Sequence, residues 1–346
     1  MQRQGLDSLD ELEQQDDTRH DGRKEQRSRG RRAFLVLIAL VVLLVGSVAG
    51  FIGYVGWRIN GNVTQENLLP VDRSPITAPD GSVVPETGVG TNFLVIGSDT
   101  RPGDAGRSDV IVLVHLPQNG SKVQLIHFPR DLYVDIPGRG KDKINAAYAY
   151  GREPLLVETM ETLLKIRINH VARTDFEGFQ KMTDAVGGVR VYAEEAGSSN
   201  GVAVKKGFND FNGEQALKFV RERYALSEGD ISRGKRQLAF IKALMLKATS
   251  PESIKNPLTI AKFANAATDN LVVDQDLSIG AMKDYAFSLK GVRGDDVVFA
   301  TAPFSGFGTA PNGGSIDVVD QAGMDRLGAA LRTDTMDTYD DTFVTP

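Results

Sequence analysis

The hydrophobic pattern of the chain is dominated by an apolar run from Ala33 to Trp57 that contains no charged residue. Its length matches that of a helix crossing the hydrocarbon core of a bilayer. Residues 23–32, just before it, carry six cations and one anion, whereas residues 58–90 carry two cations and four acids. Because positive charge accumulates on the cytoplasmic side, the pattern predicts a single-pass anchor with a cytoplasmic N-terminus and an external remainder.

A cleaved signal peptide is the alternative interpretation, because Ser47-Val48-Ala49 resembles a small-residue cleavage site. The apolar run before this tripeptide is already longer than a typical signal core and continues to Val55, which favours an uncleaved anchor. Residues 1–32 mix both charges without apolar periodicity, as is typical of a disordered cytoplasmic tail. Residues 58–90 are rich in Pro, Gly, Asn and Thr and predict an extracytoplasmic stalk.

Beyond the stalk, strand-like and helix-like segments interleave along the chain. This order predicts one α/β domain, residues 91–335, in which helices pack on a mixed central β-sheet, followed by a C-terminal tail, residues 336–346. The turn residues PQNGS at 117–121 predict a hairpin. The predicted strands are 91–97, 109–116, 122–128, 169–174, 187–193 and 295–303, and the predicted helices are 153–166, 176–186, 213–224, 232–248, 253–267, 276–289 and 320–332.

Composition narrows the function classes only slightly. With a net charge of −5, the chain lacks the strong basic excess of a nucleic-acid binder, so no nucleic-acid partner is expected. The chain has no cysteine, which excludes disulfides, thiolate metal sites and cysteine nucleophiles. The motifs GxSxG, HExxH and GxxxxGK[ST] are also absent. His115 and His127 alternate within apolar strands and are expected in the core, as is the stripe Phe176, Phe179 and Met182.

The first candidate site segment is the loop GSDTRPGDAGRSD, residues 97–109, which joins two predicted strands. Asp99 and Asp109 flank this loop, and Arg101 and Arg107 lie between them. Two carboxylates beside arginines suit a divalent cation, most naturally Mg²⁺, that also contacts phosphate oxygens. An acidic turn with solvated ion pairs is the alternative for this segment alone.

The second candidate segment is FPRDLYVDIPGRGKDKINAAYAYG, residues 128–151. Pro129 stiffens the chain where a strand ends, so Arg130 and Asp131 are held in place. Lys143 and Asn145 stand at the entry of a short helix, where backbone N–H groups also favour anions. A turn with helix-capping polar groups explains this segment equally well when it is taken alone.

The third candidate segment is FVRERYALSEGDISRGKRQ, residues 219–237, which places cations beside an apolar seam. Cations at the start of a helix oppose its macrodipole, and Asp230 supplies only one compensating charge. Guanidinium groups suit phosphate recognition, although surface charge is the usual explanation for arginines on a helix. With the other two segments, these residues form the inventory for holding a diphosphate. The candidate ligands here are Arg221, Arg223, Arg233, Arg236 and Gln237.

These motifs carry a family resemblance. GSDTR, GRSD, the 128–151 segment, VGGVRV, NGEQALKFVRER and GDISRGKRQ occur in one order over residues 90–250. The chain resembles the LytR–CpsA–Psr family, membrane-anchored enzymes that attach glycopolymers to the bacterial cell wall. The resemblance implies an α/β fold whose helices and mixed sheet enclose an apolar tunnel for a polyprenyl chain. It also implies a bacterial cell membrane location with an extracytoplasmic catalytic domain.

The implied reaction is transfer of a glycan-1-phosphate from a polyprenyl diphosphate carrier to a sugar hydroxyl of peptidoglycan. By motif position, Asp99 and Asp109 match magnesium ligands, and either Asp109 or Asp131 could take the proton of the acceptor hydroxyl. A polyprenyl-diphosphate phosphatase and a non-catalytic polymer-binding anchor are the alternative functions. The residues that match diphosphate ligands are Arg107, Arg130, Arg221, Arg223, Arg233 and Gln237, followed with less specificity by Lys143, Arg101 and Arg236.

Three positions depart from the family pattern. His127 stands where a small hydroxyl residue is expected, and Ser232 stands where glycine is expected before Arg233. The glycine pair expected after Tyr150 is reduced to Gly151-Arg152. None of these changes removes a predicted ligand, so we expect the site to be intact.

Overall fold

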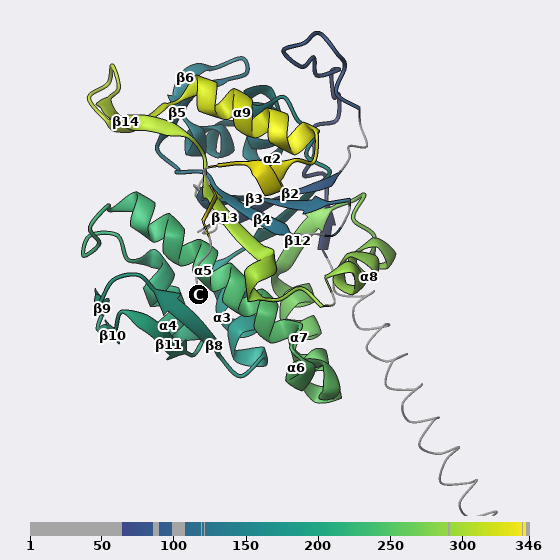
Figure 1. The fold of residues 1–346 in the computed structure, drawn as a ribbon, viewed down its shortest axis with the longest axis vertical. Helices are drawn as coiled ribbons and strands as arrows, with labels where there is room; N and C mark the ends of the chain where they lie inside the picture. Colours follow the sequence, from purple (N-terminus) through teal and green to yellow (C-terminus); the bar gives the residue numbers. More distant parts are fainter. Residues whose placement is uncertain are drawn as a thin grey trace, which may run out of the picture. The chain divides into compact units, whose positions relative to one another are not determined.

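An eight-stranded sheet in the order β1-β12-β7-β2-β3-β4-β13-β16 organises the protein (Figure 1). The structure is a computed structural model that describes residues 64–85, 90–98, 108–118, 120, 122–289, 291–340 and 342–343. The predicted cytoplasmic tail and anchor, residues 1–57, and most of the 97–109 loop lie outside these residues. No helix within the described ranges is both long and apolar enough to cross a bilayer.

The centre of the sheet is mixed, as predicted. β2 (Gly90–Ser98), β3 (Ser108–Pro117) and β4 (Val123–His127) form an antiparallel meander. β7 (His170–Thr174) pairs parallel with β2, and β13 (Val297–Thr301) pairs parallel with β4. Every residue of β4 is buried, because helices cover both faces of the sheet.

Two groups of helices cover the two faces. α2 (Ile144–Leu164) and α9 (Gln321–Arg332) lie on one face, and α5 (Asp230–Ala248) lies on the other (Figure 1). α3 (Phe176–Ala185), α4 (Gly213–Arg221), α6 (Pro251–Lys255), α7 (Pro257–Asn270) and α8 (Ile279–Ser288) complete the helices of the described chain. The predicted helix 253–267 is two helices, because Pro257 begins α7 and Asn256 caps it.

α2 contains two helical parts, which correspond to the short helix predicted to start near Lys143 and Asn145 and to the helix predicted over 153–166. α2 is interrupted at Gly151 and Arg152, and Arg152 adopts φ 57° and ψ −152°. A left-handed φ is strained for an arginine, which explains why a glycine pair is expected there. The Arg152 guanidinium lies 4.9 Å from the centre of the Tyr148 ring.

Three smaller sheets were not predicted as sheets, although the predicted strand 187–193 is present as β8 in one of them. β5 (Leu132–Ile136) and β6 (Gly140–Lys143) form a hairpin, and β15 (Ser315–Val319) pairs parallel with β5. β14 (Phe304–Thr309) completes this four-stranded sheet. The two-stranded pairs are β8 (Val189–Ala193) with β11 (Gly207–Phe211) and β9 (Gly197–Ser199) with β10 (Val202–Val204).

The predicted domain boundaries need correction at both ends. β1 (Thr64–Glu66) lies within the predicted stalk but pairs parallel with β12 (Leu271–Asp274), and Leu68 is 1% exposed in the core. At the other end, the described residues of the predicted tail, 336–340 and 342–343, belong to the domain. Met336 is buried, and β16 (Thr342–Phe343) pairs with β13. Buried apolar residues within these polar stretches, Leu68 and Met336, therefore extend the domain beyond the predicted bounds 91–335.

Candidate active site

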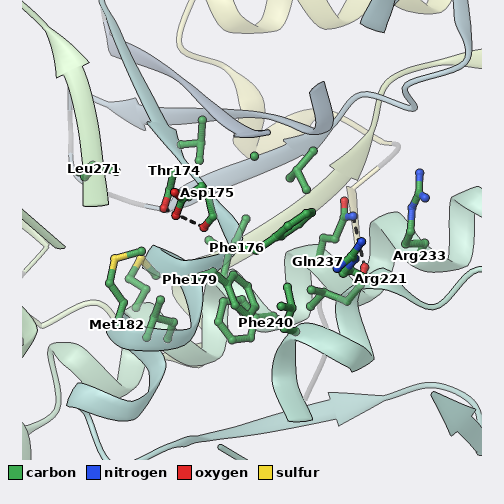
Figure 2. A pocket seen from close by; sticks show the side chains of 18 of the residues that line it. Thr174, Asp175, Phe176, Phe179, Met182, Arg221, Arg233, Gln237, Phe240 and Leu271 are labelled. Atoms are coloured by element: carbon green, nitrogen blue, oxygen red, sulfur yellow. Dashed lines mark hydrogen bonds between the residues drawn. The ribbon is translucent and has the colours of Figure 1, made fainter. Parts of the chain in front are cut away.

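A cavity of about 460 Å³ lies between the sheet and the helices α3, α4 and α5 (Figure 2). Alternation along β2 explains its position, since Leu94 and Ile96 are fully buried on the opposite face while Val95 and Gly97 line the cavity. A β-carbon at Gly97 would overlap the side chain of Val110, so glycine is required for close packing there. The remaining apolar lining is Val110, Phe176, Phe179, Met182, Leu217, Val220, Phe240, Ile241, Leu244, Met245, Phe263 and Leu271.

The stripe predicted to be core, Phe176, Phe179 and Met182, is therefore a cavity wall. All three side chains are only partly buried, although Phe179 stacks on Phe240 with ring centres 4.1 Å apart. The periodic pattern of α3 correctly identified the face of the helix that points inward. It could not distinguish a filled interior from a hollow one, because both require apolar side chains.

Cationic side chains from separate elements converge on one end of this cavity. Arg130 follows β4, Arg221 ends α4, Arg223 follows it, and Arg233 lies in the first turns of α5. Figure 2 shows Arg221, Arg233 and Gln237 together, away from Met182 and Leu271 at the other end. The structure thus brings together five of the predicted ligands at the border of an apolar space.

The end of α4 holds two of these arginines in defined positions. The Arg221 guanidinium lies 4.3 Å from the centre of the Phe176 ring, a cation–π contact. The Glu222 carboxylate accepts backbone N–H groups of Arg223, Tyr224 and Ala225, which closes the turn after the helix. Burial opposes ionisation of Glu222, but these N–H groups outweigh it and lower its pKa.

Arg233 and Gln237 are nearly buried on successive turns of α5. Arg233 forms an ion pair with Asp230, whose Oδ1 also lies 3.7 Å from Arg130 Nε. Asp230 occupies the first turn, where a negative charge is favourable. Gln237 Nε2 donates to the Val220 carbonyl at 3.4 Å and so connects α5 to α4.

Asp131 and Lys143 form a second charged pair next to this group. Lys143 Nζ donates to Asp131 Oδ1 at 2.7 Å, and Asp131 Oδ2 lies 3.7 Å from Arg130 Nε. The backbone N–H of Asn145 donates to the Arg130 carbonyl at 3.3 Å, which ties the start of α2 to the turn after β4. Local sequence therefore positions Arg130, Asp131 and Lys143 beside one another.

Arg236 lies apart from this group, which corrects its predicted place among the substrate ligands. It does not line the cavity, and its side chain is 5% exposed. The guanidinium lies 4.5 Å from the centre of the Phe219 ring and donates to Ser199 Oγ at 2.8 Å. Burial lowers its pKa. This arginine connects α5 to α4 and β9.

The predicted magnesium site lies largely outside the described residues. Asp99, Arg101 and Arg107 are among the undescribed residues, and Asp109 is described only as part of the β3 backbone. The register pairs Ser98 with Ser108, so the two ends of the loop lie side by side. In the part of the chain that the structure describes, no three His, Asp or Glu side chains are arranged to hold a metal.

With this geometry established, comparison with known proteins assigns the chain to a family. The LytR_cpsA_psr family model matches residues 63–333. The chain belongs to this family. The sequence resemblance is confirmed, and the match begins within the predicted stalk, at the point where the fold begins.

Curated relatives of this LytR–CpsA–Psr protein are named for cell wall synthesis. The chain is 33% identical over 260 residues to Corynebacterium glutamicum LcpB, whose name assigns it to cell wall biosynthesis. This match covers 70% of the chain and 61% of LcpB. It is 38% identical over 230 residues to Oceanobacillus iheyensis TagU, named a polyisoprenyl-teichoic acid–peptidoglycan teichoic acid transferase, covering 64% of the chain and 69% of that protein.

Solved structures share the fold. The crystal structure of Bacillus subtilis TagV matches with a TM-score of 0.63 at 26% identity and covers 75% of this chain and all of TagV. TagT bound to LIIa-WTA matches with a TM-score of 0.60 at 25% identity and covers 75% of this chain and 99% of TagT. The predicted mixed α/β fold is thereby confirmed.

The histidine that departs from the family pattern is accommodated by a glycine on α5. His127 is 2% exposed, as predicted for a core histidine, and its ring packs against Gly234, where a β-carbon would overlap it. Burial, and then the charge of Arg233, lower the pKa of His127 to about 3. A neutral imidazole therefore supports the start of α5 directly behind the cationic group.

Sequence reasoning missed Asp317, a charged residue next to the site. Asp317 of β15 is 4% exposed, and its backbone N–H donates to the Asp131 carbonyl at 2.9 Å. Burial, with the charges of Asp131 and Asp230, raises the pKa of Asp317 to about 6. Nothing in the local sequence SIDVV marks this residue, because β15 reaches the site only through long-range pairing with β5.

Proposed function

We propose that this protein is a membrane-anchored, Mg²⁺-dependent phosphotransferase. It moves a glycopolymer-1-phosphate from a polyprenyl diphosphate to a sugar hydroxyl of peptidoglycan. The proposal rests on one observation: a group of arginines lies at one end of an apolar cavity. An amphiphile with a long hydrocarbon tail and a polyanionic head has the complementary chemistry. The names of TagU and LcpB, which refer to this chemistry and to the cell wall, support the proposal.

In the proposed complex, the polyprenyl tail occupies the apolar cavity and packs against the stacked rings of Phe179 and Phe240. Burying its apolar surface would stabilise the complex by roughly 25 cal/mol per Å² removed from water. The diphosphate lies at the arginine end, where Arg221 and Arg233 donate charge-assisted hydrogen bonds to its oxygens. Arg130, Arg223 and Gln237 complete the group. The tail is thereby anchored while the glycan remains outside.

Asp99 and Asp109 are the proposed Mg²⁺ ligands. Two observations support this assignment: the oxygen chemistry of the pair, and the β2–β3 register that places Ser98 opposite Ser108. A bound Mg²⁺ would neutralise charge on the phosphate oxygens. Arg107 and Arg101, on the same loop, are proposed to assist by binding the same oxygens.

The transfer needs no covalent intermediate on the protein. The acceptor hydroxyl oxygen attacks the phosphorus next to the glycan, and its proton passes to Asp131. The bond from this phosphorus to the bridging oxygen breaks, and the electron pair leaves with polyprenyl phosphate. Arg130, Arg221 and Arg233 stabilise the negative charge that develops on the transferred group and the leaving oxygen. Asp131 is preferred as base because it adjoins Arg130, which lines the cavity.

The apolar run Ala33–Trp57 is the proposed single membrane anchor, with the N-terminus in the cytoplasm of a bacterial cell. Anchoring keeps the catalytic domain near a donor that itself resides in the membrane. It also places the domain on the side where peptidoglycan is assembled.

Product analysis tests this function. The full-length protein in detergent is incubated with Mg²⁺ and a polyprenyl diphosphate-linked glycan, with and without peptidoglycan fragments. We expect glycan phosphate attached to the fragments, together with release of polyprenyl phosphate. Release of free phosphorylated glycan, with none attached to the fragments when they are present, would support a phosphatase. Binding without release of either product would support a polymer-binding anchor.

A further inference from the structure

Asp317 occupies a fixed position behind the proposed catalytic base. β15 pairs parallel with β5, and the register places Asp317 opposite Leu132, the residue after Asp131. The hydrogen bond from the Asp317 backbone N–H to the Asp131 carbonyl holds the two residues together. Backbone pairing between β15 and β5 therefore fixes where Asp317 lies relative to Asp131.

The Asp317 carboxyl is buried, and one of its oxygens makes no hydrogen bond in the described part of the chain. The side chain is 4% exposed, and within the described part of the chain Oδ2 has no hydrogen-bond partner. Burying an unsatisfied carboxyl normally destabilises the folded state, so stability does not explain its presence. A buried polar group that destabilises the fold beside a candidate site is typical of a functional role.

The charged groups that face Asp317 come from three elements. Asp131 precedes β5, Lys143 ends β6 and Asp230 begins α5. Asp230 is already neutralised by Arg233 and lies near Arg130. Lys143 donates to Asp131, and its charge also favours ionisation of Asp317, so it is the cation that acts on both carboxylates.

We propose that Asp317 is a positioning residue of the transfer reaction, which acts through the Asp131–Lys143 ion pair. When Asp317 is protonated, Lys143 stabilises only one carboxylate, that of Asp131, and makes it a poor proton acceptor. When Asp317 is ionised, Lys143 is shared between two carboxylates, and Asp131 can take the proton of the acceptor hydroxyl. This inference rests on the proposed function and adds to it a residue that controls when the base is competent.

The raised pKa of Asp317, about 6, places this control within the range of an ordinary assay. Transfer by the full-length wild type should rise as the pH increases through this value. Asp317→Asn holds the position permanently neutral at nearly constant volume. We expect this variant to lack the step near pH 6 and to be slower above it by on the order of 10-fold, the effect of one pKa unit.

A matched control is available on the neighbouring strand. The carboxylate of Asp135 in β5 is 75% exposed and pairs only loosely with Lys141, at 3.9 Å. Asp135→Asn removes the same charge from the same sheet and should retain the wild-type pH profile and rate. A profile altered equally in both variants would indicate a general effect of net charge and would overturn the inference.

Thermal unfolding provides a readout that does not depend on activity. Because the pKa of folded Asp317 lies above the ordinary aspartate value of 3.8, its stabilising contribution is fully present below that value and is lost as pH rises through about 6. Asp317→Asn should therefore melt at a higher temperature than the wild type at pH 7.5. This advantage should shrink as pH falls towards 4.

The outcomes separate this inference from the function on which it rests. If Asp317→Asn and the wild type transfer glycan phosphate to peptidoglycan with the same pH profile, the role of Asp317 is overturned and the proposed function is not. A lower melting temperature for Asp317→Asn at pH 7.5 would also overturn that role, since that result indicates a purely structural residue. Absence of transfer by the wild type at every pH would overturn both proposals.

Discussion

The two faces of the central sheet are built from similar residues but differ in how completely they are packed. On the face covered by α2 and α9, Leu94, Ile96 and Ile111 are fully buried in a continuous core. On the face covered by α3, α4 and α5, Val95 and Phe179 are only partly buried because they border the cavity. One face stabilises the fold, and the other leaves space for a ligand.

This difference predicts that neighbouring residues of β2 respond unequally to truncation. Leu94→Ala should reduce the free energy of unfolding by about 2–5 kcal/mol, because it creates a cavity in a filled core. Val95→Ala should cost less than about 1 kcal/mol, since it only enlarges a space that already exists. Denaturant unfolding of both variants measures the contrast. Equal losses would mean that the second face is as tightly packed as the first.

The second contrast is between two arginines one turn apart on α5. Arg233→Ala should slow transfer by on the order of 10²-fold or more, as expected for the loss of a group that stabilises the transition state. Arg236→Ala should leave the rate per folded molecule nearly unchanged. It should instead lower the melting temperature, since the side chain packs on Phe219 and donates to Ser199. Rate and melting curves for both variants separate the roles, and a large rate loss in a well-folded Arg236→Ala would return Arg236 to the site.

Filling the cavity tests its proposed occupant. Leu244→Trp should weaken binding of a long-chain polyprenyl donor by on the order of 10-fold, equivalent to about 1.4 kcal/mol. Binding of a short, water-soluble diphosphate analogue should be affected much less, because the arginines remain. Calorimetric titration with both ligands measures the difference. Equal weakening for both would indicate that Leu244→Trp disturbs the arginine group rather than the tail site.

The last prediction concerns His127 and the pH dependence of stability. Because burial lowers its pKa to about 3, the unfolded chain binds a proton that the folded protein does not as pH falls below about 6.5. His127 therefore destabilises the fold increasingly between about pH 6.5 and pH 3. His127→Gln should have a flatter pH dependence of melting temperature over this range than the wild type. An unchanged slope would mean that the imidazole is protonated in the folded state.

The sequence was informative wherever apolar periodicity was strong. It predicted β2, α3 and α9 close to their observed bounds, because their buried faces follow simple spacing. It missed β5 and β6: β6 is polar, and the alternating buried residues of β5, Leu132, Val134 and Ile136, extend over only five positions. It also could not separate Arg233 from Arg236, because residues three apart share a helix face. Only tertiary packing against Phe219 shows that Arg236 points elsewhere.

Asp317 illustrates the same limit at longer range. The residue lies more than 180 positions after Asp131 in the sequence, and only the pairing of β15 with β5 brings them together. By contrast, Arg130, Asp131 and Lys143 are close in sequence, and their grouping was predicted. Local motifs thus grouped the candidate ligands that a single segment contributes, whereas the position of Asp317 beside them could be found only from the fold.

The central claim, that a hydrocarbon tail and a diphosphate share one site, is tested most directly by a structure of the protein with Mg²⁺ and a polyprenyl diphosphate. We expect the tail in the apolar cavity, against Phe179 and Phe240, and phosphate oxygens within hydrogen-bond distance of Arg221 and Arg233. A diphosphate bound away from these arginines, or a tail lying outside a cavity closed by side chains, would contradict it.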